Sequence, residues 1–390
     1  MENIPEPVMN DHDKAAQYLY ELAIKLLELK GSDIFITAGS PAALKVNQDI
    51  QRVSGQKLMP QQTALLVRSI MNDRQARDYD QHHEINFSLN FPDLARFRVS
   101  AFTQRGSAGM VLRLIQQQIP TIEELNLPPI LKDIAMHKRG LVIFVGGTGC
   151  GKTTSLAAMV DHRNSRCREH IVTVEDPIEF FHRHKQCLVD QREVGVDTES
   201  YEVALKNTLR QAPNVILIGE VRDRETMQYA LNFAETGHLC LTTLHANNTD
   251  QAFDRIVNFF PEEKRAQVLM DLSFNVRAFI SQRLLPREDQ PSLIPAVEVL
   301  LNTPLMAELI FQGRVKEIKS VMARSSEQGI VTFDDALFNL YEAGRISYET
   351  TIRHADSANN LRLRIKLESK RPQPHVAGAA LQLEEDKKRR

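Results

Sequence analysis

Residues 146–153 read Gly-Gly-Thr-Gly-Cys-Gly-Lys-Thr and fit the pattern G-x-x-x-x-G-K-[ST] of a phosphate-binding loop. The glycines allow a tight turn that brings backbone N–H groups close to phosphate oxygens. Lys152 is expected to reach the β- and γ-phosphates, and the Thr153 hydroxyl to ligate magnesium. The sequence therefore predicts a site for ATP and Mg²⁺.

The flanking residues favour this interpretation over a chance glycine-rich turn. Leu141–Val145 is a continuous apolar run, typical of a strand buried on both faces, and residues 154–160 predict the start of a helix. Cys150 is interpreted as a small loop residue and not as a nucleophile. The expected nucleotide contacts in this stretch are Gly147, Thr148, Gly149, Cys150, Gly151, Lys152, Thr153 and Thr154.

Carboxylates follow two further apolar strands. Glu220 comes after Val215–Ile218, in the position of a Walker B acid, and could orient water or act as a base. We predict that Thr153 and Glu220 are the residues that hold the metal ion. Glu175, Asp176 and Glu179 form a second acidic cluster after residues 171–174. The alternative for any acid at a strand end is a helix cap or a surface charge.

Two histidines flank the next predicted strand, residues 239–244. A neutral imidazole at His238 or His245 could sense the γ-phosphate or hold a carboxylate. A structural histidine bonded to the main chain is an equal alternative on the residues alone.

Arginines Arg96, Arg98, Arg105 and Arg113 lie in the first part of the chain, some at alternating strand positions. Arginine is the preferred partner of phosphate oxygens because its guanidinium is planar and permanently charged. Without further information, a solvated sheet face is the better interpretation of this set.

The remaining pattern predicts two domains of an α/β protein. A small α+β domain is expected over residues 13–115, a linker over 116–120, and a domain of alternating strands and helices over 121–369. Ligands bind at the carboxyl ends of strands in such parallel sheets. From Asp250 to Ile365 the pattern is mostly helical, with Val268–Leu285 and Thr332–Ala343 as the clearest helices.

Residues 1–12 and 370–390 are predicted to be disordered. The basic segment Lys387–Arg390 could contact an acidic surface, although a solvated segment is the simpler interpretation.

Composition limits the function further. With 390 residues, two or three domains are expected, and the net charge of −2 argues against a nucleic-acid partner. The four cysteines are at least 17 positions apart, so they form no C-x-x-C metal motif and suit a reducing cytosol. No secretory signal or spanning apolar stretch is visible, so we expect a cytoplasmic protein without direct membrane insertion.

Taken together, the motifs resemble a known family. TVEDPIEF (173–180), ILIGEVRD (216–223) and ETGHLCLTTLHA (235–246), after the phosphate loop, are similar to secretion-type ATPases of the PilT/PilU group. In the first domain, GSDIFITAG (31–39) and RFRVSAFTQRG (96–106) match as well. The resemblance covers about residues 13–367.

This resemblance implies a PAS-like N-terminal domain followed by a RecA-like P-loop ATPase domain with a helical C-terminal part. It further implies a homo-hexameric ring that drives type IV pilus retraction (twitching motility) at the inner-membrane pilus base, beside the platform protein. Residue roles implied by the family complete the picture: Glu175, Asp176 and Glu179 form the Asp box, with Glu179 its favoured catalytic carboxylate; Glu220 is the Walker B glutamate; His238 and His245 form the His box; and Arg96, Arg98 and Arg113 reach nucleotide within the ring. Arg105 is one position away from the arginine usual in PilT, so no role is carried over to it.

Two absences direct the resemblance toward PilU, the accessory retraction ATPase that works with PilT. The tetracysteine zinc subdomain usual in assembly ATPases is missing, and residues 304–311 read PLMAELIF where PilT carries AIRNLIRE. Two alternatives stay open: a non-catalytic ATP-binding ring subunit or adaptor, and a nucleic-acid motor. The first is disfavoured because Lys152, Thr153, Glu179 and Glu220 are all present. Near-neutral charge disfavours the second.

Overall fold

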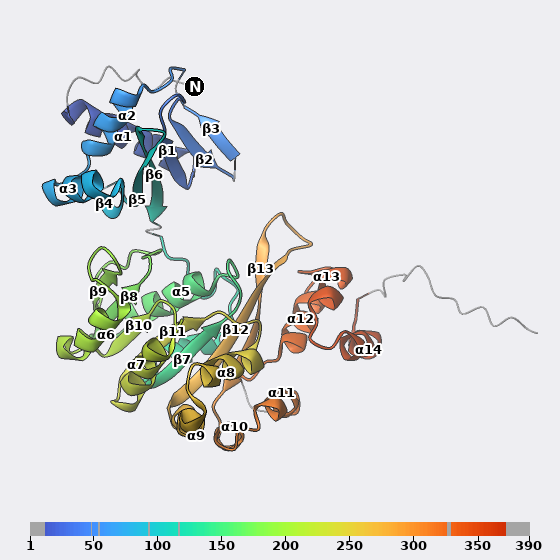
Figure 1. Ribbon diagram of the computed structural model, residues 1–390. Coiled ribbons are helices and arrows are strands. Elements are labelled where there is room, and N and C mark those ends of the chain that lie inside the picture. The colour runs from blue at the N-terminus through green and yellow to red at the C-terminus, as the bar shows by residue number, and fades with distance from the viewer. Residues whose placement is uncertain are drawn as a thin grey trace, which may run out of the picture.

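The protein folds into two lobes, each built on its own β-sheet, as the computed structural model in Figure 1 shows. The structure describes residues 12–47, 49–53, 55–92, 94–115, 118–325 and 329–371. Residues 1–11 and 372–390, predicted to be disordered, and Gln116–Gln117 of the predicted linker lie outside this part. Three residues of the predicted disordered ends are ordered: His12 begins the first helix, and Lys370 and Arg371 bond to Glu342 and Glu288.

The N-terminal lobe is a six-stranded antiparallel sheet with three helices, in the order β3-β2-β1-β6-β5-β4. Its elements are α1 (His12–Glu28), β1 (Asp33–Ile36), β2 (Ala43–Val46), β3 (Asp49–Arg52), α2 (Pro60–Arg68), α3 (Asp73–His82), β4 (Glu84–Phe91), β5 (Ala95–Gln104) and β6 (Ser107–Ile115). Helix α1 buries Leu19, Leu22 and Leu26, whose three- and four-residue spacing gives it one apolar face toward the sheet. Helix α3 was not predicted, because Tyr79 is its only buried residue and gives no apolar period.

The C-terminal lobe contains a seven-stranded sheet in the order β13-β12-β7-β11-β10-β8-β9, parallel except for β13. Its strands and the helices between them are α4 (Ile130–Ala135), β7 (Gly140–Val145), α5 (Lys152–Asn164), β8 (His170–Glu175), β9 (Leu188–Glu193), α6 (Tyr201–Thr208), β10 (Val215–Ile218), α7 (Arg224–Glu235), β11 (Leu239–Leu244), α8 (Thr249–Asn258), α9 (Arg265–Asn275), β12 (Val276–Pro286) and β13 (Leu293–Leu301). Short 3₁₀ turns cover Leu209–Gln211, Glu262–Lys264 and Val315–Glu317. Helices cover both sheet faces, with α4 and α5 in one apolar core and α6 to α10 in the other.

One predicted helix is wrong. Val268–Leu285 divides into most of α9 and most of β12, so the region from Asp250 to Ile365 is less helical than predicted. Strand β12 is buried on both faces between β7 and β13, and therefore lacks the polar–apolar alternation that identifies a strand. Its apolar residues also occur at helical spacing, and only pairing with β7 decides between the two structures.

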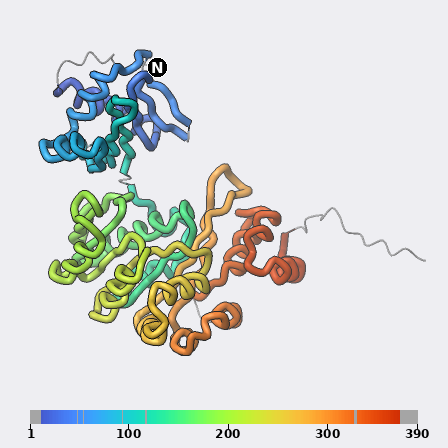
Figure 2. Tube along the Cα trace, in the orientation of Figure 1, coloured from blue at the N-terminus to red at the C-terminus, as the bar shows by residue number. Residues whose placement is uncertain are grey.

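Five helices end the described chain: α10 (Pro304–Phe311), α11 (Ile318–Met322), α12 (Phe333–Glu342), α13 (Tyr348–His354) and α14 (Ala358–Glu368). Helices α12 to α14 pack with the distal half of the β12–β13 hairpin in a separate apolar core. The Cα trace in Figure 2 shows this hairpin extending beyond the rest of its sheet, with the last helices beside it.

Candidate active site

The predicted chemical residues meet at one edge of the seven-stranded sheet. Strands β7, β11, β10 and β8 are parallel neighbours, so their carboxyl ends share that edge. The residues that follow them line one pocket of about 200 Å³. Its lining is Thr148, Gly149, Lys152, Thr153, Glu175, Asp176, Pro177, Glu179, Tyr201, Gly219, Glu220, Arg222, Thr243 and His245.

Glycine is required in the loop between β7 and α5 for two different reasons. Gly149 and Gly151 have φ angles of +76° and +87°, a backbone conformation that residues other than glycine rarely adopt. At Gly146 a Cβ atom would lie 2.4 Å from Cys150 Sγ. The loop is thereby shaped so that helix α5, which begins at Lys152, presents its N-terminus to the pocket.

The ammonium of Lys152 is held by the loop itself. Its Nζ donates to the carbonyl oxygens of Gly146 at 2.7 Å and Gly147 at 2.8 Å. Burial lowers the pKa of Lys152, while the negative charges of nearby groups, Glu220 and Glu179 among them, oppose that shift. Negatively charged phosphate oxygens accept stronger hydrogen bonds from an ammonium group than neutral carbonyl oxygens do. Lys152 is therefore suited to bind an anion in this pocket.

Gln282, which no sequence motif predicted as a site residue, clamps the phosphate loop. Its Nε2 donates to Cys150 O at 2.8 Å, and its Oε1 accepts from the Ser155 hydroxyl at 2.8 Å. A Cβ on Gly151 would lie 2.7 Å from the same Nε2. Gln282 lies on β12, next to β7, and was missed because its segment was predicted as helix.

Glu220 lies in a network of charged side chains. One carboxylate oxygen is 2.8 Å from Arg222 Nε, and the other is 3.3 Å from His245 Nε2. Arg222 also bonds Asp176 at 3.1 Å and thus joins the two acidic segments. Burial, followed by the charge of Lys152, lowers the pKa of His245, which favours a neutral imidazole beside Glu220.

The second acidic segment contains two different kinds of carboxyl group. Glu175 is buried, and burial raises its pKa to about 7, although Thr173 and Gln191 donate to it at 2.6 Å and 3.2 Å. Glu179 is exposed and lines the pocket. Asp176 is exposed and lines the pocket as well, but it is paired with Arg222, whereas Glu175 is buried at the strand end.

His238 does not belong to the site within this chain. It precedes β11, whereas His245 follows it, and six strand residues separate opposite edges of the sheet by about 20 Å. Its Nδ1 lies 3.2 Å from Phe233 O and 3.1 Å from Thr236 Oγ1. The direction of the strand thus places His238 at the edge of the sheet opposite the pocket, and a nucleotide contact at His238 stays a prediction.

The arginines that the resemblance assigns to the nucleotide lie in the N-terminal lobe and outside the lining of the pocket. They are Arg96, Arg98 and Arg113. Arg98 and Arg113 face each other across β5 and β6. Arg113 pairs with Asp33 at 2.8 Å, and the Arg96 guanidinium lies 5.9 Å from the Phe181 ring of the C-terminal lobe. Within this chain Arg96 thus lies beside the C-terminal lobe, and none of the three arginines lines the pocket of the phosphate loop.

A second cavity, of about 300 Å³, adjoins the same loop. Gly151, Thr154 and Gln282 form one wall, and residues 124–127 together with the β12–β13 hairpin form the rest. Thr154 thus faces away from the acidic pocket. The loop has a carboxylate-rich cavity on one side and a mixed polar and apolar cavity on the other.

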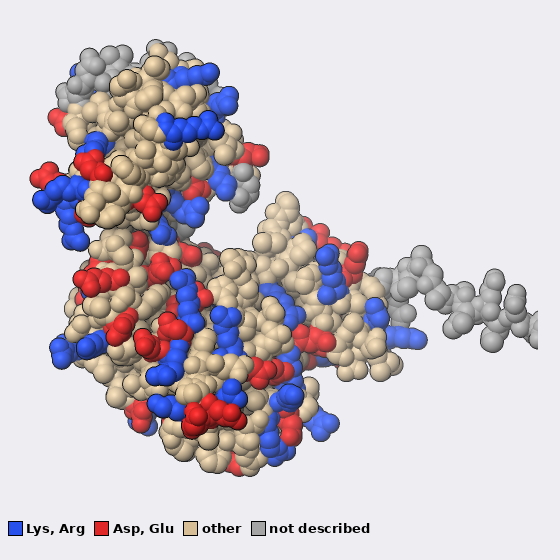
Figure 3. Space-filling view, viewed as in Figure 1, with Lys and Arg blue, Asp and Glu red and all other residues tan. Residues whose placement is uncertain are grey.

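On the face in Figure 3, acidic and basic side chains are interspersed over the C-terminal lobe. Among the described residues, no helix is long and apolar enough to cross a membrane. No group of three or more His, Cys, Asp or Glu side chains in the described ranges is arranged to hold a metal without other ligands.

Comparison with known proteins agrees with this geometry. The family model described as "Type II/IV secretion system protein" matches residues 9–357. The type IV pilus ATPase PilU of Pseudomonas aeruginosa is 55% identical over 372 residues, 94% of this chain and 97% of its own length. The pilus retraction ATPase PilT of the same organism is 40% identical, covering 84% of this chain and 95% of its own. A crystal structure of the pilus retraction motor PilT with bound ADP superposes with a TM-score of 0.80 at 35% identity, covering 88% and 98% of the two chains.

Proposed function

Because the chain belongs to the type II/IV secretion system protein family, and within it to the PilT/PilU-type pilus ATPases, we propose that it is an ATP-hydrolysing motor that assists type IV pilus retraction. The observation that carries this proposal is the meeting of Lys152, Glu220 and His245 in one pocket. A phosphate loop supplies binding, and the carboxylate and imidazole supply the groups that hydrolysis needs.

The reaction is attack of water on the γ-phosphate of ATP, giving ADP and phosphate. Lys152 leaves its loop carbonyls for the β- and γ-phosphates, because charge-assisted bonds to phosphate are stronger. Glu220 orients the attacking water, and Glu179 is the second carboxylate that faces it. His245 holds Glu220 by one oxygen and reports whether the γ-phosphate is present. Arg222 must release Glu220 when substrate enters, which its half-exposed side chain permits.

The site also fits Mg²⁺. Magnesium keeps several waters and is usually bound through one or two protein oxygens plus substrate phosphates, so a cage of three protein ligands is not needed. Thr153 and Glu220 line the same pocket and would hold it. When bound, the ion neutralises charge on the phosphate oxygens. The second cavity, beside Thr154, suits the nucleoside half of the nucleotide, because it adjoins the loop on the side away from the carboxylates.

The chain works as a homo-hexameric ring in this proposal. A phosphate loop alone lacks enough positive charge for the transition state, and an arginine from a neighbour is the common remedy. Arg96, Arg98 and Arg113 lie on one sheet of the N-terminal lobe, away from their own chain's pocket. We assign them to the site of the adjacent subunit, reached when the lobes move about residues 116–120.

The finer domain assignment belongs to the same proposal. Residues 13–115 form a PAS-like domain and residues 121–369 a RecA-like ATPase domain, in keeping with their antiparallel and parallel sheets. The ring acts in the cytoplasm at the inner-membrane base of the pilus, with a PilT-type ATPase and the platform protein as partners. Similarity to PilU over 94% of the chain supports the accessory role.

Steady-state ATP hydrolysis tests the proposal. Purified wild type and Lys152→Ala are assayed alone and with a purified PilT-type ATPase. Lys152→Ala should lose turnover, because the phosphate charge is then uncompensated. Lys138→Ala, at an exposed position, is the matched control and should keep wild-type turnover.

Two results would contradict the proposal. Near-wild-type turnover by Lys152→Ala would mean that the pocket is not the site of hydrolysis. The second result is wild-type protein that binds ATP but does not hydrolyse it, either alone or with its partner. The chain would then be a non-catalytic ring subunit.

A further inference from the structure

A third pocket, of about 470 Å³, lies far from the phosphate loop along the chain, in the helical C-terminal part. Helices α11, α12 and α14 surround it, and Glu298 of β13 lies at its base. Its charged lining is Glu298, Lys319, Asp334, Asp335, Asp356 and Arg364. Four acidic and two basic side chains leave it with two excess negative charges.

Glu298 distinguishes this pocket from an ordinary acidic surface. The residue is fully buried, and its Oε1 accepts a bond from the Thr249 hydroxyl at 2.7 Å. Its Oε2 is buried and has no hydrogen-bond partner among the described residues. Burial raises the pKa of Glu298, since the charged form lacks solvation there. A buried carboxylate oxygen without a partner is costly, and a cation beside it would remove that cost.

The other carboxylates of the pocket already have partners. Asp356 pairs with Lys319 and with Arg283 at 3.0 Å, and Asp335 pairs with Arg364 at 2.6 Å. The unused acceptor is therefore on Glu298, inside a pocket of negative excess charge. An occupant should carry an ammonium or guanidinium group with N–H donors.

We propose that the basic segment Lys387–Arg390 of the same chain docks in this pocket and places one of its cationic side chains against Glu298. The segment reads Lys-Lys-Arg-Arg and lies outside the described residues. Arg364 lines the pocket, and the described chain ends only seven residues later, at Arg371. The 16 residues from Arg371 to Lys387 span about 22 Å as a flexible chain and about 50 Å when extended. Tethering at this length gives an effective concentration on the order of millimolar, so a weak intrinsic contact suffices.

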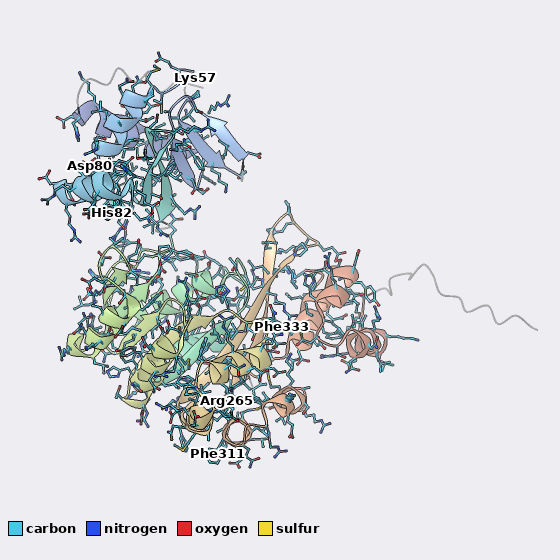
Figure 4. All side chains as sticks on the ribbon, in the orientation of Figure 1. Lys57, Asp80, His82, Arg265, Phe311 and Phe333 are labelled. Carbon is cyan, nitrogen blue, oxygen red and sulfur yellow. The ribbon has the colours of Figure 1, made fainter. Side chains whose placement is uncertain are left out.

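Pocket and nucleotide site are connected through short contacts. Thr249, bonded to Glu298, begins α8 four residues after His245. Arg283, bonded to Asp356, also donates to Asn247 O at 3.4 Å. The Arg283 guanidinium lies 4.0 Å from the Phe333 ring, and Figure 4 shows Phe333 between the sheet and the last helices. Occupancy of the pocket should therefore steady the segment that carries His245.

Hydrogen–deuterium exchange on the full chain tests the docking, and it needs no nucleotide hydrolysis. We compare wild type with a full-length variant that carries Lys387→Glu, Lys388→Glu, Arg389→Glu and Arg390→Glu. Charge reversal should speed exchange over residues 318–323 and 356–364 about two- to tenfold, as expected for losing a tethered ligand near its Kd. Residues 245–252 should show a smaller change in the same direction. The matched control changes the acidic neighbours, Glu384→Lys, Glu385→Lys and Asp386→Lys, and should retain protection.

Two pocket variants complete the test. Glu298→Gln removes the charge but can still accept from Thr249, so with a wild-type melting temperature it should reproduce the loss of protection. Ala323→Lys, on the exposed rim, supplies a built-in cation and should make exchange insensitive to reversal of the segment. Unchanged exchange on charge reversal would overturn the proposal. Protection that appears only when 1,4-diaminobutane is added would also overturn it, because the pocket would then bind a free cation and not the segment. Protection confined to the pocket, without residues 245–252, would overturn the connection to the nucleotide site.

Discussion

Replacing Gln282 by alanine should weaken nucleotide binding although the phosphate loop itself keeps its sequence. The side chain bridges the Cys150 carbonyl and the Ser155 hydroxyl, both at 2.8 Å, and is itself buried. Its removal breaks two hydrogen bonds of about 1 kcal/mol each and leaves two groups without partners. The loop can loosen while the sheet stays folded. Nucleotide binding must then order the loop again, and the free energy of the two lost hydrogen bonds is therefore subtracted from the free energy of binding.

We take about 2 kcal/mol as that ordering cost, which at about 1.4 kcal/mol per factor of ten raises the Kd about 30-fold. Ser155→Ala removes one of the two bonds and should raise the Kd about fivefold. The assay is titration with a fluorescent ADP analogue, with thermal melting to check the fold. Gln312→Ala, at an exposed glutamine whose side chain bonds Glu308 and Arg314, is the matched control and should not change the Kd.

Wild-type affinity in Gln282→Ala, with an unchanged melting temperature, would refute the reasoning, because the loop would then hold its shape without the clamp. A fall in melting temperature alone would place the lost energy in global stability and not in the loop.

Three further predictions concern the same site. Glu220→Gln should lower kcat by about 10²–10⁴ while the Kd for ATP stays within about twofold, since water orientation acts mainly in the transition state; equal losses in stopped-flow binding and turnover would make Glu220 a magnesium ligand or a structural residue instead of the residue that orients water. Burial raises the pKa of Glu175 from 4.5 to about 7, so its contribution to stability is complete below pH 4.5 and is lost as pH rises to about 7. Thermal melts should show this decline in wild type and a flatter profile in Glu175→Gln; parallel profiles would contradict it. Mixing Lys152→Ala subunits with Arg96→Ala/Arg98→Ala subunits should restore partial ATPase activity that neither homomer has; an arginine variant that is fully active alone would rule out their interfacial role.

How far the sequence predicted the fold depends on local patterning. Strands β10 and β11 were predicted with the bounds that the structure has, because each is a continuous apolar run between polar residues. Strand β12 was assigned to a helix, since burial on both faces removes the alternation that marks a strand. Helix α3 was missed for the opposite reason, as it buries almost nothing.

For the site, the sequence alone determined the phosphate loop and the acids and histidine at neighbouring strand ends. Spacing within one segment specifies a glycine turn and a helix N-terminus, and the parallel sheet then brings Lys152, Glu220 and His245 to one edge. It did not separate His238 from His245, because the two flank one strand and only its direction in the sheet distinguishes them.

Contacts between distant segments were decided by the tertiary structure alone. The clamp between Gln282 and Cys150 joins residues 132 positions apart, and the bond between Thr249 and Glu298 joins residues 49 apart. Such pairs have no local pattern, because their partners are chosen by strand order and helix packing and not by spacing along the chain. The same holds for the Glu298 oxygen that has no partner in the described part of the chain: the local sequence does not indicate which pocket this glutamate will face, because β13 must first pair with β12 and the last helices must pack around it.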